Sequence, residues 1–487
     1  MGVLQTVRKF TTKYKNLAAP VKASLWFVVC GFLQKGIAML TTPVFTRLMT
    51  SAEYGRYNVY STWFNLVQII ASLNLAAGVY TRGLVGNEED QDVFSSSMLG
   101  LSTVCILFFA GVYLLLHRQL NSIMGLNTLL MVAMFVEIWA TAAYQFWSAR
   151  ERVNYRYRKL VAITLLYVAL RPAVGILCVL RSGYDNQVEA RAVPAAVVNL
   201  IIFSFLFVSI VRKGKVLYRK DYWSYALKFN LPLIPHYLSQ IILNQADKLM
   251  ITRICGAAET AYYSVAYAIA SVLQILNNAI AGTMNPWIYK SIKNHQEDQI
   301  GPVSYMILGI IALANFIIVA IAPEFLSLMA PADYQKAVWV IPPVTTSVYF
   351  MFLYNLFATF EYYYNRTKYV MYVTVASALL NVGLNALFIP RFGFVAAGYT
   401  TLFCYVLCAA AHYLFLLKVS RECMDGKRIY KGSVILGLGI LLILASIAIS
   451  LTYRHRIVRY SFLAACMAGI FVKRKKLIGV FSTLKER

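Results

Sequence analysis

The sequence predicts an all-α polytopic membrane protein with about fourteen transmembrane helices, arranged as two parallel six-helix lobes and a terminal helix pair. Three observations support this prediction. Of the 487 residues, 60% are hydrophobic and only 14% are charged, whereas a soluble chain carries roughly a quarter charged residues. Apolar runs of about 20 residues, the length that crosses a bilayer, recur along the whole chain. The third observation is an internal repeat.

The repeat relates the segment from Thr46 to Val59 to the segment from Thr252 to Val265, 206 positions later. Six of the fourteen aligned residues are identical in a run without gaps. Self-similarity over so long a period indicates duplicated structural units. We therefore expect two related halves, and in each of them an apolar helix that ends, turns and re-enters an apolar run.

The apolar runs place the expected spans in order. The first six cover 24–46, 57–81, 94–116, 122–147, 160–180 and 192–211, and the next six cover 229–252, 260–288, 302–322, 337–360, 369–389 and 393–417. The last pair covers 432–453 and 457–472. The predicted organisation is an N-terminal lobe over 1–211, a basic linker over 212–228, a C-terminal lobe over 229–417, and a basic linker, terminal helix pair and basic tail over 418–487. Because six is even, both lobes enter the membrane in the same direction, which makes the repeats parallel.

The net charge of +26 does not indicate nucleic-acid binding, because the basic residues gather in alternate loops as the positive-inside rule expects. With both termini in the cytosol, 32 of the 46 lysines and arginines fall in cytosolic segments. We therefore expect a multi-pass protein with both ends cytosolic, whose surroundings are the lipid bilayer and not nucleic acid.

Ionisable residues inside spans are costly and usually face the protein interior. The candidates for a substrate-binding cavity are basic: Lys35, Arg171 and Lys248 inside spans, with Arg47 and Arg253 at repeat-equivalent outer ends. Lysines and arginines with few acids between them favour an anionic substrate group such as a diphosphate. The candidates for coupling or structural charges are Glu137, Asp247 and His236.

Several candidates also have a purely structural interpretation. Glu137 and Arg171 lie about 17 residues on either side of a turn, so an antiparallel hairpin would place them at similar depth as an ion pair. The neighbours Asp247 and Lys248 point about 100° apart and do not face each other. The long side chains of Arg47 and Arg253 can reach the membrane interface.

Catalytic motifs are absent from the sequence. It contains no GxxxxGK[ST] phosphate loop, so ATP hydrolysis by this chain is not expected. No outer loop is long enough to house a glycosyl-transfer site, and the five histidines are scattered without ligand spacing. Cys404 and Cys408 are interpreted as packing residues and not as a metal pair. We expect a transporter without a cofactor or metal site, and not an enzyme.

Several motifs together resemble a family. Residues 247–251 (DKLMI), followed by Gly256 and 263–265 (YSV), are similar to the seventh-to-eighth-helix signature of bacterial polysaccharide repeat-unit flippases. These flippases belong to the multidrug/oligosaccharidyl-lipid/polysaccharide (MOP) exporter superfamily. Further matches are 51–57 (SAEYGRY), 363–368 (YYNRTK) and, most specifically, the run of Asn381, Asn385, 389–393 (IPRFG) and 396–398 (AAG). Ala261 departs from the family's usual glycine, which affects only the local turn geometry.

The resemblance covers the whole chain and implies a MATE-like fold of the MOP type. It also implies that undecaprenyl-diphosphate-linked oligosaccharide repeat units are translocated across the bacterial cytoplasmic (inner) membrane by alternating access. The product would serve O-antigen, capsule or another surface polysaccharide, with the polymerase and glycosyltransferases of the same pathway as candidate partners. A proton or sodium gradient is the candidate driving force. Two alternatives stay open: a MATE-like drug/cation antiporter, which would need an acidic cavity, and a flippase for lipid-linked peptidoglycan precursors.

Overall fold

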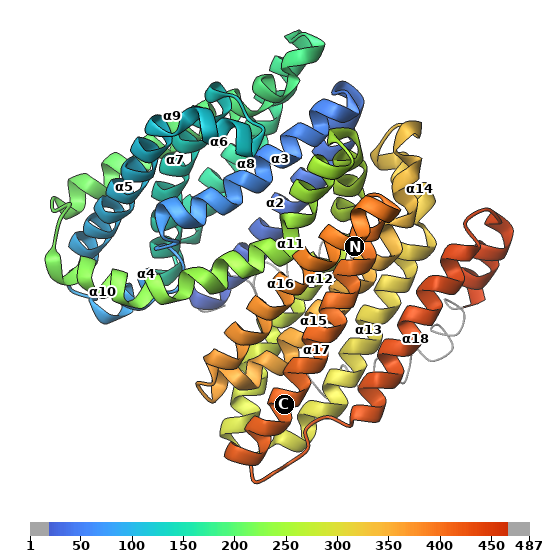
Figure 1. Cartoon of the computed structure of the whole chain (residues 1–487). Coiled ribbons are helices and arrows are strands. Elements are labelled where there is room, and N and C mark those ends of the chain that lie inside the picture. The colour runs from blue at the N-terminus through green and yellow to red at the C-terminus, as the bar shows by residue number, and fades with distance from the viewer. Residues whose placement is uncertain (1–18, 466–487) are drawn as a thin grey trace, which may run out of the picture. The chain divides into compact units, whose positions relative to one another are not determined.

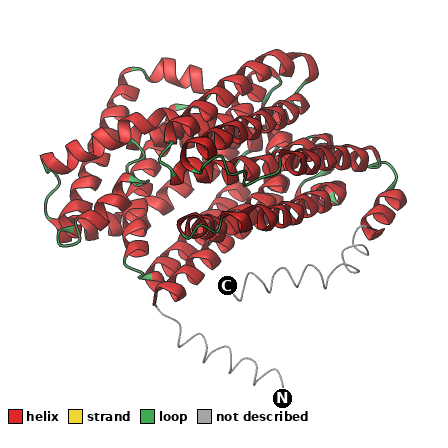
Figure 2. Ribbon diagram, turned by 90° about the horizontal axis from the view of Figure 1, so that it is seen from below, coloured by secondary structure: helices red, strands yellow, loops and turns green. Residues whose placement is uncertain are grey.

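The computed structural model describes residues 19–465, which form helices joined by short turns, with no strand in that range (Figure 1, Figure 2). By its internal contacts the chain divides into two compact units between residues 261 and 262. The sequence places the boundary between the lobes one helix earlier, at 212–228. The predicted lobes and linkers follow the repeat and not the contacts, so they stay a prediction.

The first unit is built around helix α9, which packs against α5, α7 and α8, while α2 packs against α8 and α3 against α11 (Figure 1). Apolar side chains fill two clusters, one around Tyr80, Phe94 and Phe203 and one around Tyr60 and Tyr113. The helices are α2 (Ala19–Leu48), α3 (Ser51–Ser72), α4 (Val79–Gly86), α5 (Gln91–Leu115), α6 (His117–Met124), α7 (Thr128–Val153), α8 (Tyr157–Arg181), α9 (Gln187–Gly214), α10 (Lys220–Asn230) and α11 (Ile234–Ile254).

The second unit is centred on α15 (Ile341–Tyr363), which packs against α13, α16, α17 and α18. Almost every side chain of α15 is buried, as expected for a helix that is apolar all round. The other helices are α13 (Ile300–Ala320), α14 (Ala322–Met329), α16 (Thr367–Phe392), α17 (Val395–Cys423) and α18 (Gly432–Leu451). Helix α12 (Ala257–Lys293) begins in the first unit and continues into the second.

The helices are those of a membrane protein. Within residues 19–465, nine helices are long and apolar enough to cross a bilayer, and a tenth does so if η4 (Ala332–Trp339) and α15, bent by 50°, form one span. The predicted all-helical membrane fold is confirmed. The helices agree with a count of about fourteen, which stays a prediction because the last expected span, 457–472, runs beyond the described residues.

The second expected span, 57–81, is broken in the structure. Helix α3 ends at Ser72, and Leu73 and Asn74 follow with φ of 50° and 49°. Gly78, with φ of 65°, then precedes α4. The side-chain amide of Asn230 donates to the carbonyl of Leu73, one of the groups that a helix end leaves unsatisfied. Apolar composition predicted one continuous span here. It could not indicate the break, because the residue that satisfies the helix end lies more than 150 positions away in the sequence.

Both copies of the repeat form the predicted helix–turn–helix in the same register. Helix α2 ends at Leu48 and α3 begins at Ser51, while α11 ends at Ile254 and α12 begins at Ala257, each 206 residues later. The two turns differ in how they are made. Thr50 caps α3 by accepting a hydrogen bond from the backbone N–H of Glu53, whereas the second turn uses a glycine in the left-handed region.

Candidate functional site

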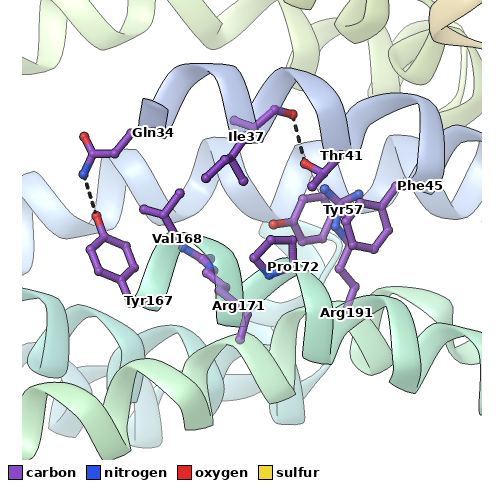
Figure 3. Close-up of a pocket in the computed structure, with 12 residues that line it drawn as sticks. Gln34, Ile37, Thr41, Phe45, Tyr57, Tyr167, Val168, Arg171, Pro172 and Arg191 are labelled. Atoms are coloured by element: carbon purple, nitrogen blue, oxygen red, sulfur yellow. Dashed lines mark hydrogen bonds between the residues drawn. The ribbon is translucent and has the colours of Figure 1, made fainter. Parts of the chain in front are cut away.

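The first unit contains a pocket of about 250 Å³ between α2, α3, α8 and α9 (Figure 3). None of the described residues that line it is acidic. Its polar lining consists of Gln34, Thr41, Tyr57, Tyr167, Arg171 and Arg191, and its apolar lining of Ile37, Ala38, Phe45, Val168, Pro172 and Ala195. The pocket therefore presents two guanidinium groups among aromatic rings and hydroxyl and amide groups.

Three of the helices around this pocket carry an internal proline: Pro43 in α2, Pro172 in α8 and Pro194 in α9. Proline has no backbone N–H, so the carbonyl four residues earlier loses its helical hydrogen bond. For Pro172 that carbonyl belongs to Val168, and both residues line the pocket. The pocket thus lies where proline interrupts the backbone hydrogen bonds of its helices. The carbonyl of Val168 is one group that loses its helical donor there.

Arg171 is held at the pocket wall by a buried carboxylate. Its Nη2 lies 2.6 Å from Oε1 of Glu137, whose side chain is 1% exposed while that of Arg171 is 32% exposed. Asn199 Nδ2 donates to the same Oε1 at 3.1 Å, and the Tyr60 hydroxyl donates to Oε2 at 3.2 Å. The ion pair expected from the hairpin geometry is present. Because Arg171 also lines the pocket, the pair orients a cation there and balances its charge.

Arg191 is the second cation of the pocket. Its guanidinium carbon lies 3.6 Å from the ring centroids of both Phe45 and Tyr57, and Nη1 lies 3.7 Å from Met49 Sδ. Aromatic faces stabilise a cation by their quadrupole without cancelling its charge. Arg191 therefore supplies positive charge that no carboxylate of the described lining balances (Figure 3).

Arg191 is absent from the residues that the sequence singled out, because the sixth span was expected to begin at residue 192. Helix α9 begins at Gln187, with Glu189 in its first turn. An acidic residue in the first turn is a helix-start signal, and that signal places Arg191 one turn inside the helix. Because the predicted span begins about one turn later than α9 does, Arg191 was placed outside the membrane span and not among the candidates.

Two predicted cations on α2 lie outside the pocket. Gln34 lines it and donates from Nε2 to the Tyr167 hydroxyl at 3.1 Å (Figure 3). Lys35 is the next residue, about 100° round the helix, and it is exposed. Arg47 is exposed as well and donates to the Pro43 carbonyl at 2.9 Å. A role for Lys35 and Arg47 in substrate binding stays a prediction.

The remaining candidates lie on or next to α11. Arg253 lines a second, smaller pocket of about 160 Å³ together with Arg56, and it donates from Nη2 to the Ile123 carbonyl at 2.6 Å. Asp247 is fully buried and Lys248 partly exposed, as expected for neighbours that point in different directions. His236 lies in the first turn of α11. Of the five predicted basic residues, Arg171 is the one that lines the pocket between α2, α3, α8 and α9.

No metal site is evident in residues 19–465, where no group of three or more His, Cys, Asp or Glu side chains is placed to hold an ion. Cys404 and Cys408 are buried cysteines on α17. The candidate chemistry of the pocket, given its lining, is anion binding by Arg171 and Arg191.

Comparison with known proteins gives matches over both halves. The family model described as polysaccharide biosynthesis protein matches residues 21–292, and the MatE model matches 232–387. Lsg locus putative protein 1 of Haemophilus influenzae is 23% identical over 386 residues, which are 74% of this chain and 89% of that protein. The probable low-salt glycan biosynthesis flippase Agl15 of Haloferax volcanii is 19% identical over 402 residues, 81% of this chain and 83% of that protein.

Solved structures show the same fold. The lipid II flippase MurJ in an inward closed conformation has a TM-score of 0.66 at 12% identity, and the match covers 89% of this chain and 100% of MurJ. The Vibrio cholerae MATE transporter VcmN in the bent form has a TM-score of 0.57 at 11% identity, covering 84% of this chain and 98% of that one. The similarity confirms the predicted MATE-like helical fold, which the MurJ structure shares.

Proposed function

Because the chain belongs to the polysaccharide biosynthesis protein family of the MOP superfamily, we propose that it is a flippase for undecaprenyl-diphosphate-linked oligosaccharide repeat units. It would move them across the bacterial cytoplasmic membrane by alternating access, without hydrolysing ATP. The similarity to a protein described as a probable glycan biosynthesis flippase supports this proposal. The observation that supports it most directly is the pocket with Arg171 and Arg191 and no acidic residue in its described lining.

The diphosphate is the part of such a substrate that the pocket suits. Planar guanidinium groups bind phosphate oxygens through paired, charge-assisted hydrogen bonds, and these are stronger in a site of low effective dielectric. The polyprenyl tail can stay in the lipid while the glycan crosses within the protein, which avoids the cost of taking sugar hydroxyls through hydrocarbon.

The same lining disfavours the drug/cation antiporter that the MatE match would suggest. A cationic substrate needs carboxylates to replace its hydration, and the described lining of the pocket has none. A peptidoglycan-precursor flippase would also bind a diphosphate, so the pocket alone does not separate it from a repeat-unit flippase. The lipid-linked saccharide that accumulates when the protein is removed separates the two.

We expect Arg191→Gln to lower surface polysaccharide export about 10- to 100-fold, because one charge-assisted contact contributes about 1.5–3 kcal/mol. The measurement is made in a strain lacking the gene and carrying a plasmid copy. Lipid-linked saccharides are quantified by mass spectrometry and surface glycan by immunoblot. The matched control is Arg181→Gln, which removes an exposed arginine at the end of α8.

Export at the wild-type level in Arg191→Gln would refute the pocket as the diphosphate site. Accumulation of a peptidoglycan precursor, and not of a repeat unit, would replace the proposed substrate by the alternative one.

The proposed topology has its own test. We expect a reporter fused after Lys220 to be cytosolic and one fused after Glu259 to lie on the outer side, because alternate loops carry the basic residues. Alkaline phosphatase and green fluorescent protein fusions, compared at equal expression, measure this. The reverse pattern would contradict cytosolic termini.

A further inference from the structure

The second unit contains a buried acid–base pair between two residues that are far apart in the sequence. Glu361, near the end of α15, and His412, on α17, are 2.8 Å apart between Oε1 and Nδ1, and both side chains are 0% exposed. Glu361 Oε2 and His412 Nε2 are buried and have no hydrogen-bond partner among the described residues. This differs from Glu137, both of whose oxygens are hydrogen-bonded.

The side chains seen to interact with the pair are an aromatic ring and a thiol. The Tyr354 ring stacks on the imidazole with centroids 5.3 Å apart and an interplanar angle of 21°. Cys408 lies one turn earlier on α17 and interacts with Glu361 and with Ser377 of α16. These are neutral side chains. Arg366, which immediately precedes α16, pairs with Glu422 near the end of α17 at 3.0 Å.

The number of protons on the pair therefore sets its net charge. With one proton beyond the one that neutral imidazole carries, the pair has no net charge: it is a carboxylic acid beside a neutral imidazole, or a carboxylate beside an imidazolium. Losing that proton leaves a net negative charge, and gaining another leaves a net positive charge. A net charge on two fully buried side chains is strongly unfavourable. The packing of α15 against α17 thus favours the neutral pair.

We propose that Glu361 and His412 form a proton-binding site whose occupancy is coupled to the packing of α15 against α17. While α15 and α17 are packed together, the pair keeps its proton and stays neutral. When the two helices separate and water reaches the pair, it exchanges that proton. A ligand shifts a conformational equilibrium by its differential affinity for the two states, and here the ligand is the proton. Intramembrane acid and histidine side chains form the proton relays of pumps and transporters.

This inference names the coupling ion of the proposed flippase, and only its link to transport rests on that proposed function. In the proposed cycle the pair takes up a proton from the side where proton concentration is high and releases it on the other side. The substrate is moved by the same change in helix packing. No covalent step is involved, and one proton is transferred between water and the pair.

Proton binding is tested on the purified full-length protein in lipid, without substrate. Infrared difference spectra between about pH 5 and pH 8 are expected to show a carboxylic acid carbonyl band that changes with pH. We expect Glu361→Gln to remove this band and His412→Gln to change how the band depends on pH, because the imidazole is the hydrogen-bond partner of the carboxyl group. The matched control is Glu422→Gln, which removes a carboxylate at the end of α17, the helix that carries His412. This change is expected to leave the band in place.

A pH-dependent band that survives in Glu361→Gln, or the absence of any such band in the wild type, would refute the site. If thermal unfolding shows that Glu361→Gln does not fold, the spectra of His412→Gln decide. A carbonyl band whose pH dependence is the same as in the wild type would refute the pair.

The link to transport is tested by glycan export in cells treated with a protonophore. Wild-type export is expected to fall when the proton gradient is removed, and export by His412→Gln to be low and insensitive to the protonophore. Wild-type export that ignores the gradient would overturn the coupling. If the wild type exports no glycan at all, the proposed function fails while the infrared result still decides the proton site.

Discussion

Replacing Glu137 by alanine is expected to lower the free energy of unfolding by about 3 kcal/mol and to abolish export. Breaking a buried ion pair by removing one partner costs about 3–5 kcal/mol, and the lower value applies because a third of Arg171 is exposed. The change also leaves Asn199 and Tyr60 without their acceptor. Chemical unfolding of the purified protein in detergent measures the first effect, and surface glycan the second.

A double-mutant cycle tests whether the pair acts as a unit. Glu137→Arg and Arg171→Glu are expected to be damaging singly, and their combination to recover part of the lost stability, because the opposite charges again face each other. Glu137→Gln serves as the isosteric comparison, since it can keep a hydrogen bond while losing the charge. Strictly additive effects would show that the two side chains are not coupled.

Gly55→Ala is expected to destabilise the protein by about 1–3 kcal/mol, the range for forcing extra atoms into a packed site. A Cβ at Gly55 would lie 1.7 Å from the carbonyl oxygen of Ala257, and a backbone carbonyl cannot move aside without shifting α12. The first turns of α3 and the start of α12 thus meet at a glycine. Thermal unfolding of purified protein measures the effect.

The matched control is Gly111→Ala on α5, where a Cβ would meet no atom within 4 Å. It is expected to be neutral or to stabilise slightly, because alanine favours helix over glycine by about 1 kcal/mol. Equal behaviour of the two variants would contradict the close approach of α3 to the start of α12.

The sequence by itself determined the features that depend on composition and local periodicity. Long apolar runs predicted a helical membrane protein because a bilayer requires such runs. The repeat predicted two helix–turn–helix segments, and the structure has them in the same register. The Glu137–Arg171 pair was accessible to sequence reasoning because equal distances from one turn set equal depths in a hairpin.

Only the tertiary structure decided which side chains meet between helices distant in sequence. The break after α3 depends on an amide from residue 230. Arg191 lies inside α9, which begins earlier than apolarity indicates, and the packing of α9 places its guanidinium against aromatic rings of α2 and α3. Glu361 and His412 meet because α15 and α17 pack together, although 51 residues separate them. Such contacts depend on the rotation and spacing of packed helices, which local sequence patterns do not encode.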